Sequence, residues 1–286
     1  MTQPARKANI TGFTAVSIFL LVIIKLLTAS LAAFADDYDL VIRQARVIDP
    51  ETGLDAIRDV GIGQGRILAI ESQLNEADAD TRIIDAAGLV LAPGFIDLHV
   101  HGQSPQAHEY QVRDGVTTAL ELEWRYPEVG AFLASRQGKA RVNYGGSVSH
   151  GALRALAMAE TEATREAARQ QLAEAVTANE PLSAVQPLVA HSFQRSLSES
   201  QQQWLAEEIS RGLSQGGIGI GMAHSYYPGA ERPEIYRVFE LAAQLNVPIY
   251  SHLRGRGLAA VQEVVANAAA TGTAIHIVHV NSTALG

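Results

Sequence analysis

The 286-residue chain contains no cysteine, and this absence excludes several kinds of site at once. Without thiols there is no disulfide, no thiolate-held zinc and no cysteine nucleophile. Lysine is nearly as scarce, because Lys139 is the only one beyond residue 25. Any metal ion must therefore be held by histidine and carboxylate.

Excess positive charge is also lacking, since the formal net charge is −8. Nucleic-acid binding requires a concentrated basic surface, so we expect no nucleic-acid partner. The composition is 47% hydrophobic, which is enough to bury a full core. The length predicts one large domain or two smaller ones, and the sequence leaves an oligomer possible.

Residues 1–35 are typical of an export signal. Arg6 and Lys7 give a basic start, residues 13–33 are mostly apolar, and Ala33 and Ala35 offer a cleavage site. Lys25 interrupts the apolar run, which disfavours the alternative of a retained membrane anchor. We expect a periplasmic or extracellular protein without a membrane association after cleavage, because no second apolar run is long enough to span a bilayer.

Residues 36–93 predict a small domain of short strands. Asp59–Gly63 and Arg66–Ile70 flank the turn residues Gln64 and Gly65, as in a hairpin. Further strands are expected at 40–42, 45–48, 82–85 and 89–92. Pro93 and Gly94 mark the boundary to the next domain.

Residues 94–286 alternate between apolar strands and helices, which predicts a parallel sheet covered by helices. A (β/α)₈ barrel of the TIM type fits, and its functional residues gather at the carboxyl ends of the strands. The expected strands are 95–101, 117–123, 141–149, 217–223, 248–253 and 274–280. The clearest expected helices are 152–178, 199–214, 233–245 and 258–270, and residues 198–201 can cap the second of these.

His99 and His101 stand two residues apart at the end of the first expected barrel strand. Residues two apart on a strand share a face, so both imidazoles can bind one zinc-class ion. Glu121 and Glu123 repeat this spacing on the next strand, where a buried carboxylate must be paired, hydrogen-bonded or metal-bound. Glu123 lies nearer the strand end and is the preferred ligand, although a buried salt bridge is an alternative interpretation.

Two later strands end in His252 and His279, and together with the first pair these histidines predict a metal site. His276 lies three residues before His279 and therefore faces the other side of its strand. His150 and His224 also follow strands, so we expect them at most to line the pocket without binding metal. His108 and His191 are interpreted as packing or surface residues.

The sequence resembles the amidohydrolase superfamily and, within it, the N-acyl-D-amino-acid deacylases (D-aminoacylases), from about residue 40 to the end. The glutamate-containing strand is similar to the D-glutamate deacylase branch. The matching segments are Gly94–Gly102, Gly115–Thr118, Leu120–Glu123, Ser149–Arg154 and Gly219–Gly229, with serine replacing the family's glycine at 149.

The resemblance implies zinc, as one or two ions, with other divalent metals as alternatives. His99 and His101 would hold one position, and His252 and His279 the other. The family bridges its metals with cysteine, glutamate or carbamylated lysine, which leaves Glu123, or Glu121, as the bridge.

The resemblance implies hydrolysis of a linear amide in a small-molecule N-acyl amino acid. The attacking nucleophile would be a zinc-activated water. Arg254 and Arg256 are candidates to bind the substrate carboxylate, and Tyr227 to donate to the carboxylate or the oxyanion. Ordinary loop roles are the alternative for all three.

The family's last barrel strand supplies an aspartate, whereas this chain has no aspartate after Asp114. About six of eight barrel strands are expected, so we interpret the chain as C-terminally truncated, with no catalytic acid or base identified. The alternatives are another amidohydrolase (dipeptidase, cyclic-amide hydrolase or deaminase) and a non-catalytic metal-binding protein.

Overall fold

A computed structural model describes residues 38–75, 79–178 and 182–283 of the chain. The export segment predicted at residues 1–35 lies outside the described residues. Internal contacts divide the chain into two compact units, residues 1–93 and 94–286. Within the described ranges, no helix has both the length and the apolar character needed to cross a bilayer.

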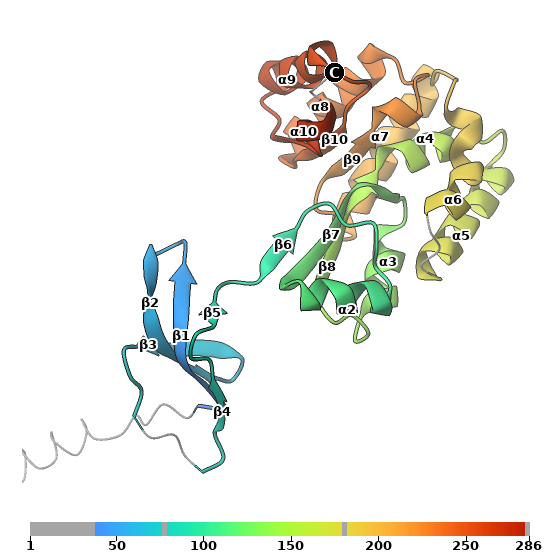
Figure 1. Cartoon of the computed structure of the whole chain (residues 1–286). Coiled ribbons are helices and arrows are strands. Elements are labelled where there is room, and N and C mark those ends of the chain that lie inside the picture. The colour runs from blue at the N-terminus through green and yellow to red at the C-terminus, as the bar shows by residue number, and fades with distance from the viewer. Residues whose placement is uncertain (1–37, 76–78, 179–181, 284–286) are drawn as a thin grey trace, which may run out of the picture. The chain divides into compact units, whose positions relative to one another are not determined.

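The first unit is a five-stranded sheet (Figure 1). Its strands follow the order β3-β2-β1-β4, with β5 also paired to β1. The hairpin turn predicted at Gln64 and Gly65 is present, with φ of 52° and 72°. Two successive positive φ angles match the twist of the flanking strands. The strands are β1 (Leu40–Asp49), β2 (Leu54–Gly63), β3 (Arg66–Glu71), β4 (Arg82–Asp85) and β5 (Val90–Leu91).

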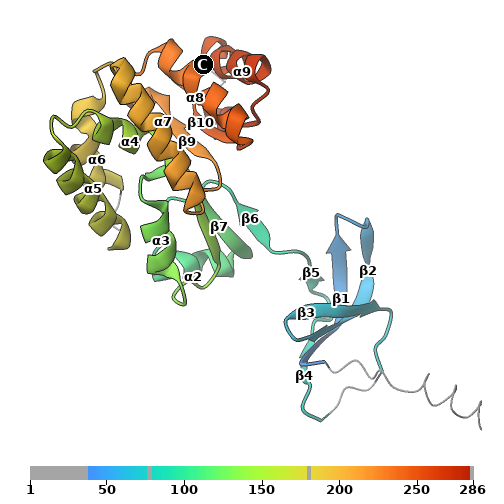
Figure 2. The same cartoon turned by 180° about the vertical axis from the view of Figure 1, so that it is seen from behind.

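The second unit is built on a six-stranded sheet in the order β11-β10-β9-β8-β7-β6, in which every neighbouring pair is parallel (Figures 1 and 2). Each predicted barrel strand has a counterpart, but most are shorter than expected because their ends bend into loops. The strands are β6 (Phe95–Asp97), β7 (Val116–Tyr126), β8 (Asn143–Ser149), β9 (Ile220–Ala223), β10 (Ile249–His252) and β11 (Ile275–Ile277).

Three of the four helices expected from the sequence are present as single helices, and the fourth is not. The stretch expected as a single helix over 152–178 is two helices, because Thr161 and Thr164 exchange hydrogen bonds in a capping box that starts a new helix. Ser198 and Gln201 form the predicted cap of α7. Helices α2, α3, α6 and α10 have no counterpart among the helices expected from the sequence. The helices are α2 (Pro105–Arg113), α3 (Val129–Arg136), α4 (His150–Ala157), α5 (Glu162–Thr177), α6 (Leu182–Val189), α7 (Glu199–Ser214), α8 (Arg232–Leu245), α9 (Leu258–Thr271) and α10 (Val280–Thr283).

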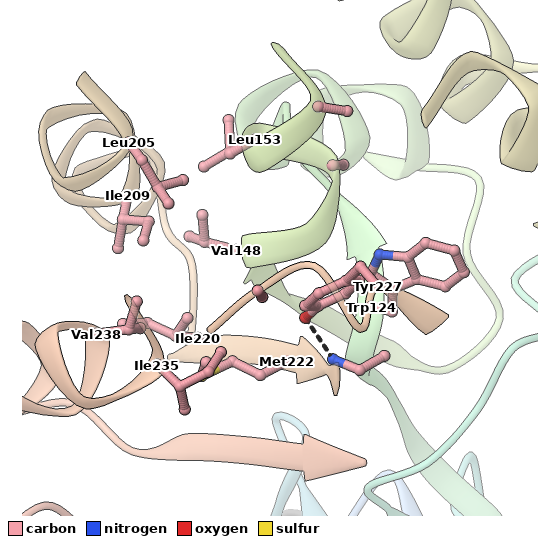
Figure 3. Packing of buried hydrophobic residues seen from close by; sticks show 14 of the residues in the cluster. Trp124, Val148, Leu153, Leu205, Ile209, Ile220, Met222, Tyr227, Ile235 and Val238 are labelled. Carbon is pink, nitrogen blue, oxygen red and sulfur yellow. Dashed lines mark hydrogen bonds between the residues drawn. The ribbon is translucent and has the colours of Figure 1, made fainter. Parts of the chain in front are cut away.

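The main core lies between one face of this sheet and its helices (Figure 3). Ile220 and Met222 of β9 are fully buried there. Because side chains alternate along a strand, the residues between them face the opposite side of the sheet. Replacing a buried isoleucine of this core with alanine costs about 2–5 kcal/mol. The helix partners shown are Leu153 of α4, Leu205 and Ile209 of α7, and Ile235 and Val238 of α8.

Candidate metal centre

Four segments meet at the carboxyl ends of the parallel strands. The chain after β6 follows β7, because the Val100 N–H donates to the Leu120 carbonyl at 3.0 Å and His99 forms a bridge with Glu121. On β9, a side-chain carbon on Gly221 would lie 2.6 Å from the Glu123 carbonyl oxygen. Glycine therefore lets β9 pass close to the end of β7.

Four imidazoles converge on one carboxylate in what we call the strand-end cluster: His99, His101, Glu123, His252 and His279. The Nε2 atoms of His99 and His101 lie 2.9 and 3.1 Å from Glu123 Oε2, and 3.0 Å from each other. His252 Nδ1 contacts the other oxygen, Glu123 Oε1. His279 Nε2 lies 3.0 Å from His252 Nδ1 and 3.6 Å from Glu123 Oε1. The structure thus brings together all five residues predicted as ligands.

Glu123 is buried, with a side chain only 6% exposed, yet it stays ionised. Burial by itself would raise the pKa of Glu123, but the hydrogen bonds with His101, His252 and His99 outweigh that effect and lower it. Hydrogen bonds first with Glu121 and then with Glu123 raise the pKa of His101 to about 10. Binding a cation at His101 Nε2 therefore requires the loss of a proton.

The two glutamates of β7, of which Glu123 is the preferred ligand from the sequence and Glu121 the alternative, have different places in the structure. Glu123 lies between the two histidine pairs, with one oxygen toward each. Glu121 is fully buried and contacts His101 from the opposite side of the ring, with its oxygens 3.0 and 3.1 Å from Nδ1. Glu123 has the geometry of a bridge, and Glu121 does not.

His279 reaches the cluster from a turn rather than from the strand expected over 274–280. Strand β11 ends at Ile277, and His279 adopts a positive φ of 34°. Such a backbone is uncommon for a residue other than glycine and recurs at functional sites. The Val278 N–H donates to the Ser251 carbonyl at 3.0 Å, which holds this turn against β10.

The cluster fits a metal ion by its donor chemistry. One ligand atom each from His99, Glu123 and His279 lies within 4.8 Å of the other two, the only such triad in the described parts of the chain. Imidazole nitrogen and carboxylate oxygen are ligands of zinc-class ions. These residues could therefore hold one or two such ions without a sulfur ligand.

A second group of ionisable residues lies near the ends of β8 and β9 and the starts of α4 and α8, and we call it the buried cluster: His150, Arg154, Tyr227 and Glu234. Arg154 Nε donates to Glu234 Oε1 at 2.7 Å, and the other guanidinium nitrogens donate to the carbonyls of Ser192 and Arg195. His150 Nε2 lies 3.3 Å from Glu234 Oε1. Burial would raise the pKa of Glu234, but the proximity of His150 and Arg154 lowers it overall.

This arrangement corrects the predicted substrate role of Tyr227, which is fully buried. Its hydroxyl accepts a hydrogen bond from the Ala223 N–H at 2.8 Å and lies 3.1 Å from His150 Nδ1, as drawn in part in Figure 3. His150 and His224 are also fully buried and do not line an open pocket. Burial, together with the charges of His150, Arg254 and His252, lowers the pKa of His224 well below its usual range.

The two arginines proposed for substrate binding differ from each other. Arg254 donates to Glu263 at 2.9 Å and to the Ala230 carbonyl at 2.8 Å, so its guanidinium is already occupied. That position contradicts the expectation of a free carboxylate clasp. Arg256 is exposed and remains available.

Sequence reasoning missed Tyr226, which lies beside the metal centre where Tyr227 was expected. The residue is 41% exposed, and its ring stacks on Trp124 with centroids 5.3 Å apart and lies 5.1 Å from the His252 ring. Residues 224–226 form a 3₁₀ helix, so side chains three apart share a side. That geometry turns His224 and Tyr227 inward and Tyr226 outward. In the sequence, the adjacency of Tyr226 and Tyr227 is the one feature that points to Tyr226 as an alternative to Tyr227.

Comparison with known proteins gives both a family and curated relatives. Residues 90–282 match the amidohydrolase family. The N-acyl-D-glutamate deacylase of Alcaligenes xylosoxydans xylosoxydans is 31% identical over 259 residues, covering 84% of this chain and 49% of that protein. The dihydroorotase of Streptococcus pneumoniae is 44% identical over 81 residues, covering 28% of this chain and 19% of that protein.

Solved structures share the fold. An N-acyl-D-glutamate deacylase from Bordetella bronchiseptica, complexed with zinc and a phosphonate inhibitor, aligns with a TM-score of 0.64 and 23% identity over 84% of this chain and 51% of that chain. A D-aminoacylase with a binuclear metal center aligns with a TM-score of 0.61 and 21% identity over 83% of this chain and 50% of that chain.

The predicted fold class, a partial TIM-type barrel after a small β domain, is confirmed. The chain spans about half the length of these relatives. Its strand-end cluster lies within the matched residues, and the chain belongs to the amidohydrolase family.

Proposed function

We propose that this chain carries the metal-binding residues of a hydrolase that removes the acyl group from N-acyl-D-amino acids with a D-glutamate-like side chain. The observation that carries the proposal is the convergence of four imidazoles on Glu123. The similarity over 84% of the chain to an N-acyl-D-glutamate deacylase supports this substrate class.

The ligands divide into two pairs around the bridge. His99 and His101 would hold one ion at Glu123 Oε2, and His252 and His279 a second at Glu123 Oε1. A zinc-class ion in this position supplies Lewis acidity and lowers the pKa of a water to about 7. Zinc is the metal we propose, because histidine and glutamate are among its usual ligands and the similar deacylase of Bordetella bronchiseptica was solved with zinc.

Two residues of this chain are suited to hold the substrate. Burial, followed by the charge of Glu123, raises the pKa of Tyr226. Its phenol therefore stays protonated and can donate a hydrogen bond to a substrate carbonyl or carboxylate. Arg256 is the exposed guanidinium that follows β10, and it can bind a carboxylate with two hydrogen bonds.

The test combines metal content with turnover. The purified full-length chain should contain at least about one zinc per molecule by elemental analysis, and both His99→Ala and His252→Ala should contain less. Hydrolysis of N-acetyl-D-glutamate, absent with the L isomer, would support the substrate class. A folded chain without zinc would contradict the metal assignment, and zinc without turnover would restrict the function to metal binding.

A cyclic-amide hydrolase is the second candidate, because a dihydroorotase matches an 81-residue segment at 44% identity. The deacylase match is favoured because it covers three times as much of the chain, 84% against 28%. Hydrolysis of dihydroorotate in preference to N-acetyl-D-glutamate would reverse this order.

We further propose that the protein is exported, on the basis of the basic, apolar and small-residue pattern of residues 1–35. Sequencing the N-terminus of the mature protein from a periplasmic fraction should begin at Asp36. An N-terminus at Met1 in the membrane fraction would instead support a retained anchor.

A further inference from the structure

The buried carboxylate of Glu121 is not used as a metal ligand in the proposed function, although it touches the centre. Its side chain is fully buried, and both oxygens lie within 3.1 Å of His101 Nδ1. Burying a carboxylate without a partner is expensive, so the position requires a specific interaction.

The contact determines which way His101 faces. Nδ1 lies against Glu121, whereas Nε2 on the far side of the ring lies 3.1 Å from Glu123 Oε2 and 3.0 Å from His99 Nε2. A carboxylate that accepts the Nδ1–H leaves the Nε2 lone pair directed toward the ligands. The half-exposed ring of His101, 48% accessible, has no enclosing core to orient it.

The backbone places Glu121 for this task. Glu121 and Glu123 share one face of β7, and the chain after β6 runs beside them through the His99–Glu121 bridge. One glutamate therefore reaches the ion-facing nitrogen of His101, and the other reaches the opposite nitrogen.

We propose that Glu121 is a positioning residue that fixes the orientation and tautomer of His101, and so strengthens the metal position held by His99 and His101. This inference rests on the proposed function, because it requires that the cluster bind metal. It predicts that the position held by His99 and His101 is affected more than the one held by His252 and His279, because both oxygens of Glu121 contact His101.

The test is a double-mutant cycle measured by zinc titration of the full chain, with a competing chelator. Glu121→Leu should lower zinc affinity about 10- to 100-fold, the usual effect of losing an outer partner of a ligating histidine. In the His101→Ala background it should change affinity by no more than about twofold, because its effect passes through His101. In the His279→Ala background the full loss should persist.

Two further variants separate positioning from a purely structural role. Glu121→Gln retains an oxygen that can accept from Nδ1–H and should recover most of the affinity. Glu234→Gln, at a buried carboxylate outside the strand-end cluster, should leave zinc affinity unchanged. Urea unfolding of each variant reports stability independently of metal.

The outcomes distinguish this inference from the function on which it rests. A wild-type chain that binds no zinc overturns both. Zinc binding that Glu121→Leu leaves unchanged, or an equal loss in the wild-type and His101→Ala backgrounds, overturns only the role of Glu121.

Discussion

The strand-end cluster and the buried cluster both combine histidine with glutamate, but only one of them is suited to a metal ion. In the buried cluster, the charge of Glu234 is balanced by Arg154, whose Nε donates at 2.7 Å. In the strand-end cluster, Glu123 is surrounded by imidazoles, which can be neutral ligands. In these two clusters, the permanent charge of a guanidinium, rather than the count of histidines, distinguishes the buried cluster from the candidate metal centre.

Accessibility follows the same division. The side chains of His99, His101, His252 and His279 are 25%, 48%, 16% and 28% exposed, so an ion and a substrate can reach them. His150 and Arg154 are completely enclosed. Residues that act on a small molecule must be accessible to it, as those of the strand-end cluster are. The buried cluster only joins β8, α4 and α8 and needs no access.

The largest effect is expected from Glu123→Ala. This substitution removes the carboxylate that contacts both histidine pairs, so zinc affinity should fall by more than the 10- to 100-fold that an outer partner costs. Zinc titration measures the loss, and circular dichroism checks that the chain stays folded. Retention of stoichiometric zinc would mean that Glu123 is a buried ion-pair partner, as Glu234 is.

Arg154→Leu should have the opposite profile, with a large loss of stability and no change in zinc affinity. It leaves Glu234 buried without its guanidinium partner, which costs about 3–5 kcal/mol of unfolding free energy in urea denaturation. Replacing both Arg154 and Glu234 with leucine should recover much of the loss, because no buried charge then lacks its partner. A selective loss of zinc in the single variant would remove the distinction between the clusters.

Strand periodicity explains how much of the metal centre is predictable from sequence. His99 and His101, like Glu121 and Glu123, are spaced to share a strand face, and parallel strands end at one edge. His252 and His279 follow from that rule. The spacing places both glutamates on one face, so the sequence only favours Glu123 because it lies nearer the strand end. The path of the chain after β6 then gives the two glutamates different contacts.

The errors arise where the chain leaves regular strands. The 3₁₀ helix over 224–226 leaves Tyr226 exposed and buries Tyr227, the tyrosine expected at the site from the sequence. Arg254 is held by Glu263, a residue of α9 that no local pattern connects to it. Glu234 follows Pro233 in the first turn of α8, where an acidic residue is ordinary, so its burial beside Arg154 was not foreseen.

A smaller effect is expected from single histidines, because each removes one ligand. His279→Ala should lower zinc affinity by at least about 10-fold, whereas the matched variant His276→Ala, on the same segment, should not. His276 packs near Tyr250, with ring centroids 6.0 Å apart, and has no contact with Glu123 in the described structure. His191→Ala is a second control on a different element. Equal zinc loss in all three variants would indicate unfolding rather than ligation.

The smallest effect concerns pH, and it tests whether Glu234 is ionised as the buried cluster requires. Its pKa is lowered in the folded chain relative to the ordinary value of 4.5, so its contribution to stability is present above that value. As the pH falls below 4.5, the unfolded chain binds the proton first, and stability drops toward the lowered folded pKa. One such group changes the unfolding free energy by at most about 1.4 kcal/mol per pH unit. Urea unfolding between pH 7 and 3 should therefore show a shallower acid slope for Glu234→Gln than for the wild-type chain. Equal slopes would mean that Glu234 is not ionised when folded, and the balance between Glu234 and Arg154 that distinguishes the two clusters would be wrong.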